Sequence, residues 1–196
     1  MTALLKEEDG LYLTFEEYLK FEERSDIKHE YLDGYVYAMS GARREHNYIG
    51  ANILALLRMQ LRGKRCAALG PDQRLTIKLP GRTFSYYPDV TVDCSEKRTL
   101  DTEEPTVLFE ITSPSTARGD RGDKLINYLN LPSLKAYAIV DQRRPHLTIH
   151  RRAADGTWRR EVVSNLKATL ALPEIECALA LREIYDRVDF ADASAE

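Results

Sequence analysis

Glu110 is a carboxylate within the apolar run Val107-Leu108-Phe109-Glu110-Ile111, which is typical of a buried strand. An unpaired carboxylate in such a strand would cost several kcal/mol, so it must be protonated, paired with a cation or bound to a metal ion. Asp89 begins a second apolar run, Pro88-Asp89-Val90-Thr91-Val92, and Lys124 lies in a later helical segment. Two carboxylates on neighbouring strands with a lysine nearby are the groups that metal-dependent cleavage of a phosphodiester needs.

The hydrolysis of a phosphodiester requires an activated water and neutralisation of the negative charge that develops on phosphorus. Mg²⁺ does both, and it prefers one or two carboxylates together with waters and phosphate oxygens. Asp89 and Glu110 are therefore candidate metal ligands, with the backbone carbonyl of Ile111 as a further one. Lys124 could hold the attacking water or stabilise the transition state. Mn²⁺ is the expected substitute for Mg²⁺.

Asp89 and Glu110 also have ordinary structural interpretations. Asp89 follows a proline, and Asp is common at turns in that position. Glu110 could be one half of a buried salt bridge, with Arg74 or Lys135 as its partner. Buried charges mark functional sites more often than they mark stability, which favours the functional interpretation for Glu110.

Lys124 taken alone could be a solvated helix lysine. Asp120, Lys124 and Tyr128 are spaced four residues apart, so they share one face of the predicted helix. That shared face could belong to a site or could simply face water.

The spacing of apolar and turn-forming residues predicts alternating strands and helices. Helices are predicted over residues 15–23, 45–62, 121–131 and 178–187. Strands are predicted over residues 28–32, 35–39, 74–79, 83–93, 107–111, 136–140, 147–151 and 158–163. Asp33-Gly34 is a strong hairpin signal, and Thr14 with Glu17 forms a capping box. The helix over 121–131 predicts a strand–helix–strand crossover between parallel strands.

The composition indicates one soluble globular domain. The 196 residues are 43% hydrophobic and 30% charged, and no repeat or linker divides them. We expect a single domain over 14–188, with flexible tails over 1–13 and 189–196. No apolar stretch approaches the ~20 residues of a membrane span, and the N-terminus lacks a signal-peptide pattern. The expected location is the cytoplasm, with no membrane partner.

Charge and cysteine content narrow the function classes. The net charge of −3 argues against non-specific coating of nucleic acid, although a local basic patch could still contact it. Cys66, Cys94 and Cys177 are odd in number, widely spaced and form no Cys-x-x-Cys pair. We therefore expect neither a disulfide framework nor a structural zinc site.

Several sequence blocks between about 14 and 152 carry a resemblance to a known family. They are Pro88-Asp89-Val90-Thr91-Val92, Phe109-Glu110-Ile111-Thr112-Ser113-Pro114-Ser115-Thr116, Asp120-Arg121-Gly122-Asp123-Lys124, Tyr128, His29-Glu30-Tyr31-Leu32-Asp33-Gly34, His46 and Tyr137-Ala138-Ile139-Val140-Asp141. Together they resemble the Uma-two family of endonuclease-like proteins, in the PD-(D/E)XK nuclease superfamily. The Glu-x-x-Ser-Pro-Ser-Thr block followed by Asp and Lys is the specific part of this match.

The resemblance implies an α/β fold, namely a restriction-endonuclease-like core with a mixed central β-sheet flanked by α-helices and additional β-hairpins. It implies a Mg²⁺-dependent endonuclease acting on nucleic acid, foremost DNA. Asp89 and Glu110 would be the catalytic metal ligands, and Lys124 the catalytic lysine. The usual superfamily lysine, two residues after the glutamate, is replaced by Thr112, so Lys124 would supply the ammonium group from the helix.

The resemblance also implies secondary site residues. Glu30 would be a further catalytic acid from the first hairpin, or else a rim carboxylate paired with Lys28 or Arg24. His46 and Tyr128 are candidate substrate contacts. A capping or packing role is the alternative for His46.

Two other function classes compete with the nuclease hypothesis. A non-catalytic nucleic-acid-binding or interaction module could retain the same fold, which the displaced lysine and the acidic net charge favour slightly. A hydrolase of some other phosphoester is the third option, because a fold does not dictate a substrate. A homodimer would suit a restriction-type nuclease, since two copies can cut both strands.

Overall fold

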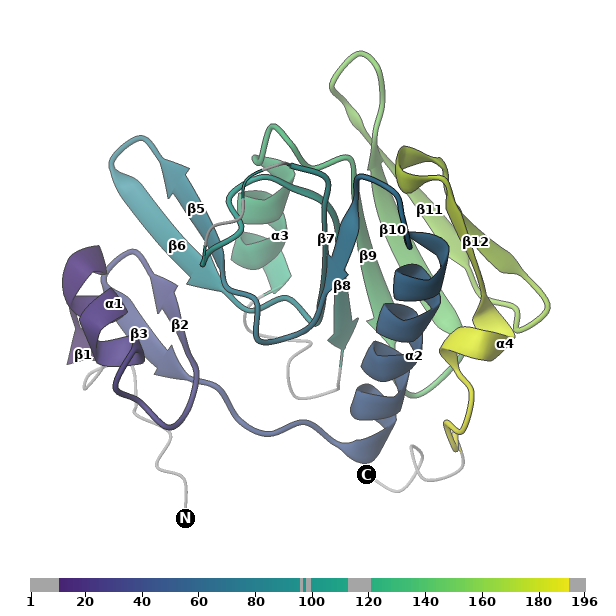
Figure 1. The fold of residues 1–196 in the computed structure, drawn as a ribbon, viewed down its shortest axis with the longest axis horizontal. Coiled ribbons are helices and arrows are strands. Elements are labelled where there is room, and N and C mark those ends of the chain that lie inside the picture. Colours follow the sequence, from purple (N-terminus) through teal and green to yellow (C-terminus); the bar gives the residue numbers. More distant parts are fainter. Residues whose placement is uncertain (1–10, 96, 98–99, 113–120, 191–196) are drawn as a thin grey trace.

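The computed structural model describes residues 11–95, 97, 100–112 and 121–190 (Figure 1). Residues 1–10 and 191–196, predicted to be flexible, lie outside the described residues. So do Ser113-Pro114-Ser115-Thr116 and Asp120 of the family motif. Figure 1 shows two main sheets side by side.

The first sheet is entirely antiparallel and has the strand order β1-β3-β2-β6-β5. Its strands are β1 (Leu11–Tyr12), β2 (His29–Leu32), β3 (Tyr35–Ala38), β5 (Leu75–Leu79) and β6 (Arg82–Tyr86). Asp33 and Gly34 join β2 to β3 with φ angles of 52° and 109°, the left-handed backbone that a two-residue hairpin requires. The predicted hairpin is confirmed, and Leu11–Tyr12, within the predicted flexible tail, pair with β3.

The second sheet has the strand order β11-β10-β9-β8-β7-β4. Its strands are β4 (Ala67–Leu69), β7 (Val90–Asp93), β8 (Pro105–Thr112), β9 (Ala136–Asp141), β10 (His146–Arg152) and β11 (Trp158–Val163). β8 and β9 are parallel and are connected through helix α3 (Arg121–Leu129), which confirms the predicted crossover. The other pairs are antiparallel, including the predicted β10–β11 hairpin.

Two apolar clusters cover opposite faces of β8. Helix α2 (Arg44–Gln60) buries Ile49, Ile53 and Leu57 against the face that carries Phe109 and Ile111. On the other face, Leu108 packs with β5, β6 and α3. Because side chains alternate along a strand, Glu110 shares the face of Leu108 and points towards α3 and the first sheet.

Helix α1 (Phe15–Glu22) begins at the predicted capping box. The Thr14 hydroxyl accepts from the Glu17 N–H, and the Glu17 carboxylate accepts from the Thr14 N–H at 2.8 Å. Tyr18 of this helix packs with Tyr31 and Val36 on one face of the first sheet. Within the described part of the chain, no helix is long and apolar enough to cross a membrane.

Two sequence-based predictions about the strands and helices are wrong. The strand predicted over 83–93 is two strands, β6 and β7, which belong to different sheets. Pro88 lies between them, and proline cannot donate to a strand ladder. The helix predicted over 178–187 is instead β13 (Cys177–Ala180) followed by the short helix α4 (Leu181–Ile184). β13 pairs with β12 (Thr169–Leu172), and alternate residues of both strands are buried.

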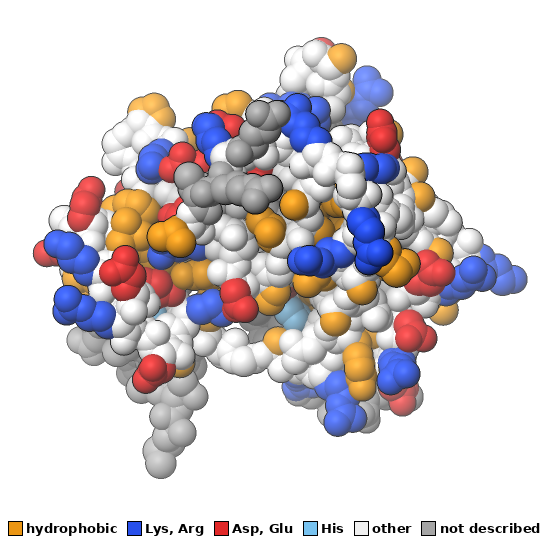
Figure 2. Space-filling view, viewed as in Figure 1, with side chains coloured by type: hydrophobic (Ala, Val, Ile, Leu, Met, Phe, Trp, Pro, Cys, Tyr) orange, Lys and Arg blue, Asp and Glu red, His pale blue; other side chains and the backbone are white. Residues whose placement is uncertain are grey.

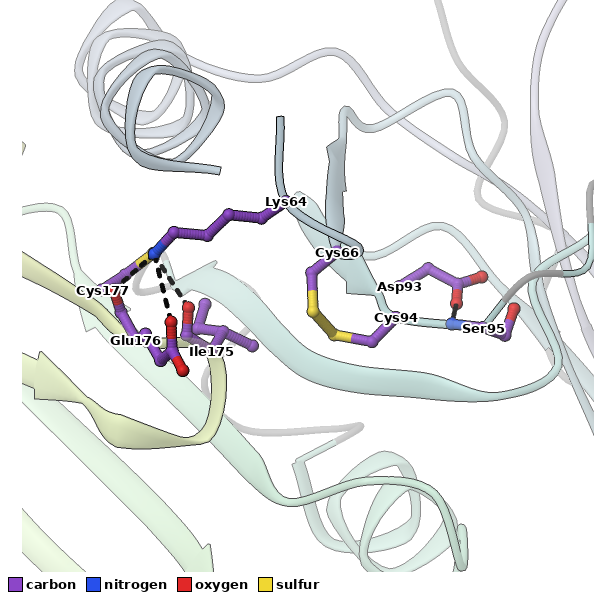
Figure 3. Close-up of a disulfide and its surroundings, with 8 residues drawn as sticks. All are labelled: Lys64, Cys66, Asp93, Cys94, Ser95, Ile175, Glu176 and Cys177. Atoms are coloured by element: carbon purple, nitrogen blue, oxygen red, sulfur yellow. Dashed lines mark hydrogen bonds and ion pairs between the residues drawn. A yellow bond between two sulfur atoms is a disulfide. The ribbon is translucent and has the colours of Figure 1, made fainter. Parts of the chain in front are cut away.

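The sequence predicts no disulfide framework, but Cys66 and Cys94 form one disulfide (Figure 3). These residues flank β4 and β7, whose register pairs Ala67 with Asp93. The partners are 28 residues apart, and only the strand pairing brings them together. Cys177 is a free, buried cysteine, so the odd cysteine count does not exclude a single bridge.

Loss of this disulfide should destabilise the fold. A bridge that closes a 28-residue separation should contribute roughly 3–4 kcal/mol in the chain-entropy description. We therefore expect Cys66→Ser/Cys94→Ser to unfold at lower urea concentration than the oxidised wild type. Cys177→Ser is the matched control for removing a thiol without a bridge. Alkylation of both Cys66 and Cys94 in the folded, oxidised protein would contradict this pairing.

Candidate active site

Five predicted site residues arrive from five different parts of the fold. Glu110 lies near the end of β8, and Asp89 immediately precedes β7, whose Val90 pairs with Phe109. Lys124 comes from α3, Glu30 from β2 and His46 from the first turn of α2. The structure therefore brings both sheets and two helices to one place.

Lys124 is the cation that neutralises Glu110. Its Nζ lies 3.0 Å from Glu110 Oε1 and donates to Glu30 Oε1 at 2.7 Å. Arg74, one of the two alternative partners of Glu110, pairs instead with Asp101. The side chain of Lys124 is only 19% exposed, so it is not a solvated helix lysine.

Glu30 belongs to the site and not to the rim. The alternative partner Lys28 pairs with Asp72 at 3.1 Å, on the exposed surface. Glu30 instead reaches across from the first sheet to Lys124. Burial alone would lower the pKa of Lys124, but the charges of Glu110 and Glu30 and their hydrogen bonds outweigh it and raise that pKa. Lys124 is therefore a protonated ammonium group at neutral pH.

Opposing effects act on the pKa of the Glu110 carboxyl group. Burial is the largest of them, and it raises the pKa of the carboxyl group, while the charge of Lys124 lowers it. The nearby charges of Asp89 and Glu30 add to the burial effect, and the pKa is raised to about 7. The Tyr128 hydroxyl donates to Glu110 Oε1 at 2.8 Å and fixes the orientation of the carboxylate.

Asp89 is tied to the strand that carries Glu110. Its Oδ2 accepts from the Ile111 backbone N–H at 2.6 Å, and its Oδ1 lies 3.2 Å from His46 Nε2. Asp89 is therefore held by contacts to both β8 and α2. An aspartate that served only as a turn residue would not need these contacts. Burial would lower the pKa of His46, but the hydrogen bond and charge of Asp89 raise it, with a further contribution from Glu110.

The structure bears differently on the substrate contacts predicted for Tyr128 and His46. Tyr128 has no exposed surface, so the substrate contact predicted for it is replaced by a role in positioning Glu110. His46 neither caps α2 nor packs in the core; it contacts Asp89 while its side chain stays 21% exposed. A substrate contact by His46 stays a prediction.

Glu22 is a positioning residue that sequence reasoning missed. Its Oε1 accepts from the His29 N–H at 2.9 Å and from the Tyr87 hydroxyl at 2.8 Å, and its Oε2 lies 2.9 Å from His29 Nδ1. His29 directly precedes Glu30, and Tyr87 lies two residues before Asp89. One buried carboxylate at the end of α1 thus holds both segments. No local spacing links Glu22 to Tyr87, so only the His29-Glu30 block pointed to this region.

The donor set fits a divalent cation of the Mg²⁺ type. Lys124 contacts the carboxylates of Glu30 and Glu110, and the charge of Asp89 also acts on Glu110, so three carboxylates gather in a poorly solvated place. Among the described residues, no group of three His, Cys, Asp or Glu side chains forms a complete metal-binding cluster. Two carboxylates completed by water and phosphate oxygens is the arrangement that Mg²⁺ prefers. Asp89 and Glu110 match that arrangement.

The chain is similar in sequence to a known protein family. Residues 15–182 match the model of the Uma2 (Uma-two) family, which is described as "putative restriction endonuclease". This chain belongs to the Uma2 family. Two similar proteins come from Synechocystis sp. (strain ATCC 27184 / PCC 6803 / Kazusa), both described as uncharacterized. One, slr1290, is 33% identical over 91% of this chain and 94% of its own length; the other, sll1609, is 30% identical over 74% and 84%.

The fold of this Uma2 chain also has a solved counterpart. A crystal structure described as a putative nuclease belonging to DUF820, from Anabaena variabilis, superimposes with a TM-score of 0.73. It covers 89% of this chain and 98% of its own chain at 17% identity. The predicted mixed α/β nuclease-like fold is therefore confirmed. In this Uma2 protein Thr112 stands two residues after Glu110, and Lys124 supplies the ammonium group beside that carboxylate.

Removal of the Glu22 carboxylate should destabilise the protein, whereas removal of the exposed Glu23 carboxylate should not. Glu22→Ala strips the buried His29 and Tyr87 of their common partner, so we expect a loss of about 3 kcal/mol in the free energy of unfolding. Glu23→Ala, at the exposed end of the same helix, is the matched control. Urea denaturation measures both. Equal midpoints for the two variants would show that Glu22 does not hold these segments.

Proposed function

We propose that this Uma2 protein is a Mg²⁺-dependent endonuclease that hydrolyses phosphodiester bonds in DNA. The observation that supports this function best is the partly buried Lys124 ammonium held between Glu110 and Glu30, with the charge of Asp89 acting on Glu110. This arrangement combines an anionic pair for a cation with a fixed positive charge for a phosphoryl group. The family description and the nuclease-like fold point in the same direction.

Each residue has a defined part in this proposal. Asp89 and Glu110 hold Mg²⁺, which when bound supplies a water of lowered pKa and neutralises phosphoryl oxygens. The Ile111 N–H and the Tyr128 hydroxyl keep the two carboxylates in place. Lys124 stays protonated, so it acts as a hydrogen-bond donor and a cation, and not as a general base.

Glu30 acts on the reaction through Lys124. Its carboxylate accepts from Nζ at 2.7 Å and helps to keep the pKa of the ammonium group high. The same contact restricts where the flexible lysine side chain can lie. Preorganised charge of this kind needs no reorganisation when negative charge develops on the substrate.

Charges on the molecular surface are consistent with a local contact to nucleic acid. In Figure 2 the basic and acidic side chains of the visible face are interspersed, with no continuous field of one sign. Together with the net charge of −3, this disfavours non-specific coating of DNA. The proposed contact with DNA therefore concentrates at the site.

Neutral substitutions of the two carboxylates should abolish metal binding and cleavage together. We expect Asp89→Asn/Glu110→Gln to bind neither Mg²⁺ nor Mn²⁺ in isothermal titration and to lose metal-dependent plasmid nicking. Glu103→Gln, which affects only an exposed pair with Lys78, is the matched control. Nicking at the wild-type rate by the double variant would refute the assignment. Metal-independent DNA binding without cleavage by the wild type would favour the non-catalytic module.

Loss of the buried ammonium group should separate catalysis from metal binding. Lys124→Met should reduce the rate of nicking by about 10²-fold or more, because a charge aimed at the transition state is removed. Metal binding should persist, since both carboxylates remain. Lys97→Met, at an exposed lysine, is the control. A variant that cleaves normally would show that Lys124 has only a structural role.

Two broader features belong to the same proposal. A homodimer would allow both strands to be cut, and light scattering on the purified protein tests it. A cytoplasmic location was expected from the sequence, whereas disulfides persist mainly in oxidising compartments. The redox state of Cys66 and Cys94 in cell extracts prepared with rapid alkylation therefore tests the location independently of activity.

A further inference from the structure

A row of tyrosines lies on one face of the first sheet. Tyr12 of β1 is directly opposite Tyr35 of β3, and Tyr37 of β3 is directly opposite Glu30 of β2. Residues opposite each other in an antiparallel pair share a face, as do residues two apart along one strand. Tyr12, Tyr35 and Tyr37 therefore lie on the same face as Glu30, and these three residues are called the tyrosine face below.

The tyrosine face is exposed, whereas the other side of the same strands is covered. Tyr31 and Val36 alternate to that other side, where α1 buries them. Tyr12, Tyr35 and Tyr37 are 67%, 45% and 43% exposed. Tyr12 and Tyr35 pack edge to face, with ring centroids 5.2 Å apart, and both still expose much of their apolar ring surface. Exposed aromatic surface of this kind is a candidate binding face.

The tyrosine face leads directly into the candidate active site. Glu30, the cross-strand neighbour of Tyr37, bonds Lys124 Nζ at 2.7 Å. Cross-strand neighbours are separated by about 5 Å, so the last ring of the row lies one side chain away from the residue that holds Lys124. A ligand that reaches Lys124 along the sheet passes over the tyrosines.

Positive charge lies at the start of α2, the helix that brings His46 to the site. Arg43 and Arg44 are exposed at the start of α2, whose His46 contacts Asp89. Figure 1 shows the segment between β3 and α2 running from the first sheet to this helix. A polyanion at Asp89 would therefore have the exposed Arg44 near it at the start of α2, and the tyrosine face beside Glu30. Aromatic platforms next to cationic groups are the usual means of holding single-stranded nucleic acid.

We propose that the tyrosine face binds unpaired nucleotides of the DNA strand that enters the candidate active site, with bases stacked on the tyrosine rings. Bases inside a duplex stack on one another and offer no free face to a side chain. The face therefore selects single-stranded or locally opened DNA, and the sequence of the bases matters little. The identity of the ligand rests on the proposed nuclease function.

Binding of labelled oligonucleotides tests this inference without cleavage. Fluorescence anisotropy in EDTA compares a short oligothymidylate with a duplex of the same length, using wild type, Tyr35→Ala/Tyr37→Ala and Tyr35→Phe/Tyr37→Phe. We expect wild type to prefer the single strand and the alanine variant to bind it about tenfold or more weakly. The phenylalanine variant should bind normally, because it keeps the rings. Met59→Ala, at an exposed residue on α2, is the control and should also bind normally.

Several results would overturn the proposal. One is an alanine variant that binds the single strand as tightly as wild type, and another is a wild type that binds the duplex more tightly than the single strand. A third is a phenylalanine variant that loses as much affinity as the alanine variant, which would assign the effect to the hydroxyl groups. Sedimentation measures self-association. If the alanine variant loses self-association but keeps its DNA binding, the tyrosine face binds a second copy of the chain instead. Circular dichroism excludes misfolding as the cause of any loss.

The same measurements separate this inference from the proposed function. Tyrosine-dependent binding by a protein that never nicks DNA would support the binding face and reject the nuclease. Metal-dependent nicking by an alanine variant whose affinity for the single strand is unchanged would support the nuclease and reject the binding face.

Discussion

Neutralisation of the buried Glu110 carboxylate is the interaction on which the site depends. Glu110 lies near the end of β8, on the face where Leu108, two residues earlier, packs in an apolar cluster. A carboxylate there is tolerable only because α3 supplies both the Lys124 ammonium group and the Tyr128 hydroxyl. The packing of α3 on β8 therefore neutralises the Glu110 carboxylate and also covers the apolar surface around Leu108.

The same ammonium group joins the two sheets chemically. Glu110 belongs to the second sheet and Glu30 to the first, and Lys124 contacts both. Behind them, Glu22 holds the start of β2 and the Tyr87 side chain, which limits how the segments carrying Glu30 and Asp89 can shift. The site is thus preorganised by buried polar contacts, which are strong where water is excluded.

The cluster is larger than a single salt bridge, since the carboxylates of Glu30, Asp89 and Glu110 lie with Lys124 and His46. A structural pair would be balanced, but here the charges of Asp89 and Glu30 act with burial to raise the pKa of Glu110 to about 7. A divalent cation would relieve that repulsion, and Lys124 would remain available for a phosphoryl group. The family description names a restriction endonuclease, and the fold is that of a nuclease-like protein.

The sequence by itself determined the local elements and the inventory of reactive groups. The capping box of α1, the Asp33-Gly34 turn and the crossover through α3 depend on neighbouring residues and on hydrophobic periodicity, so they were predictable. The anomaly of Glu110 was also visible, because burial of an acid can be read from a short apolar run. Only the tertiary structure decided the partners: Lys124 reaches Glu30 across 94 residues, and Cys66 meets Cys94 across 28. The C-terminal strands were missed for the same reason, since β12 and β13 are defined by pairing with each other. Local patterns specify conformation over a few residues, whereas contacts between distant residues arise only when the sheets and helices pack.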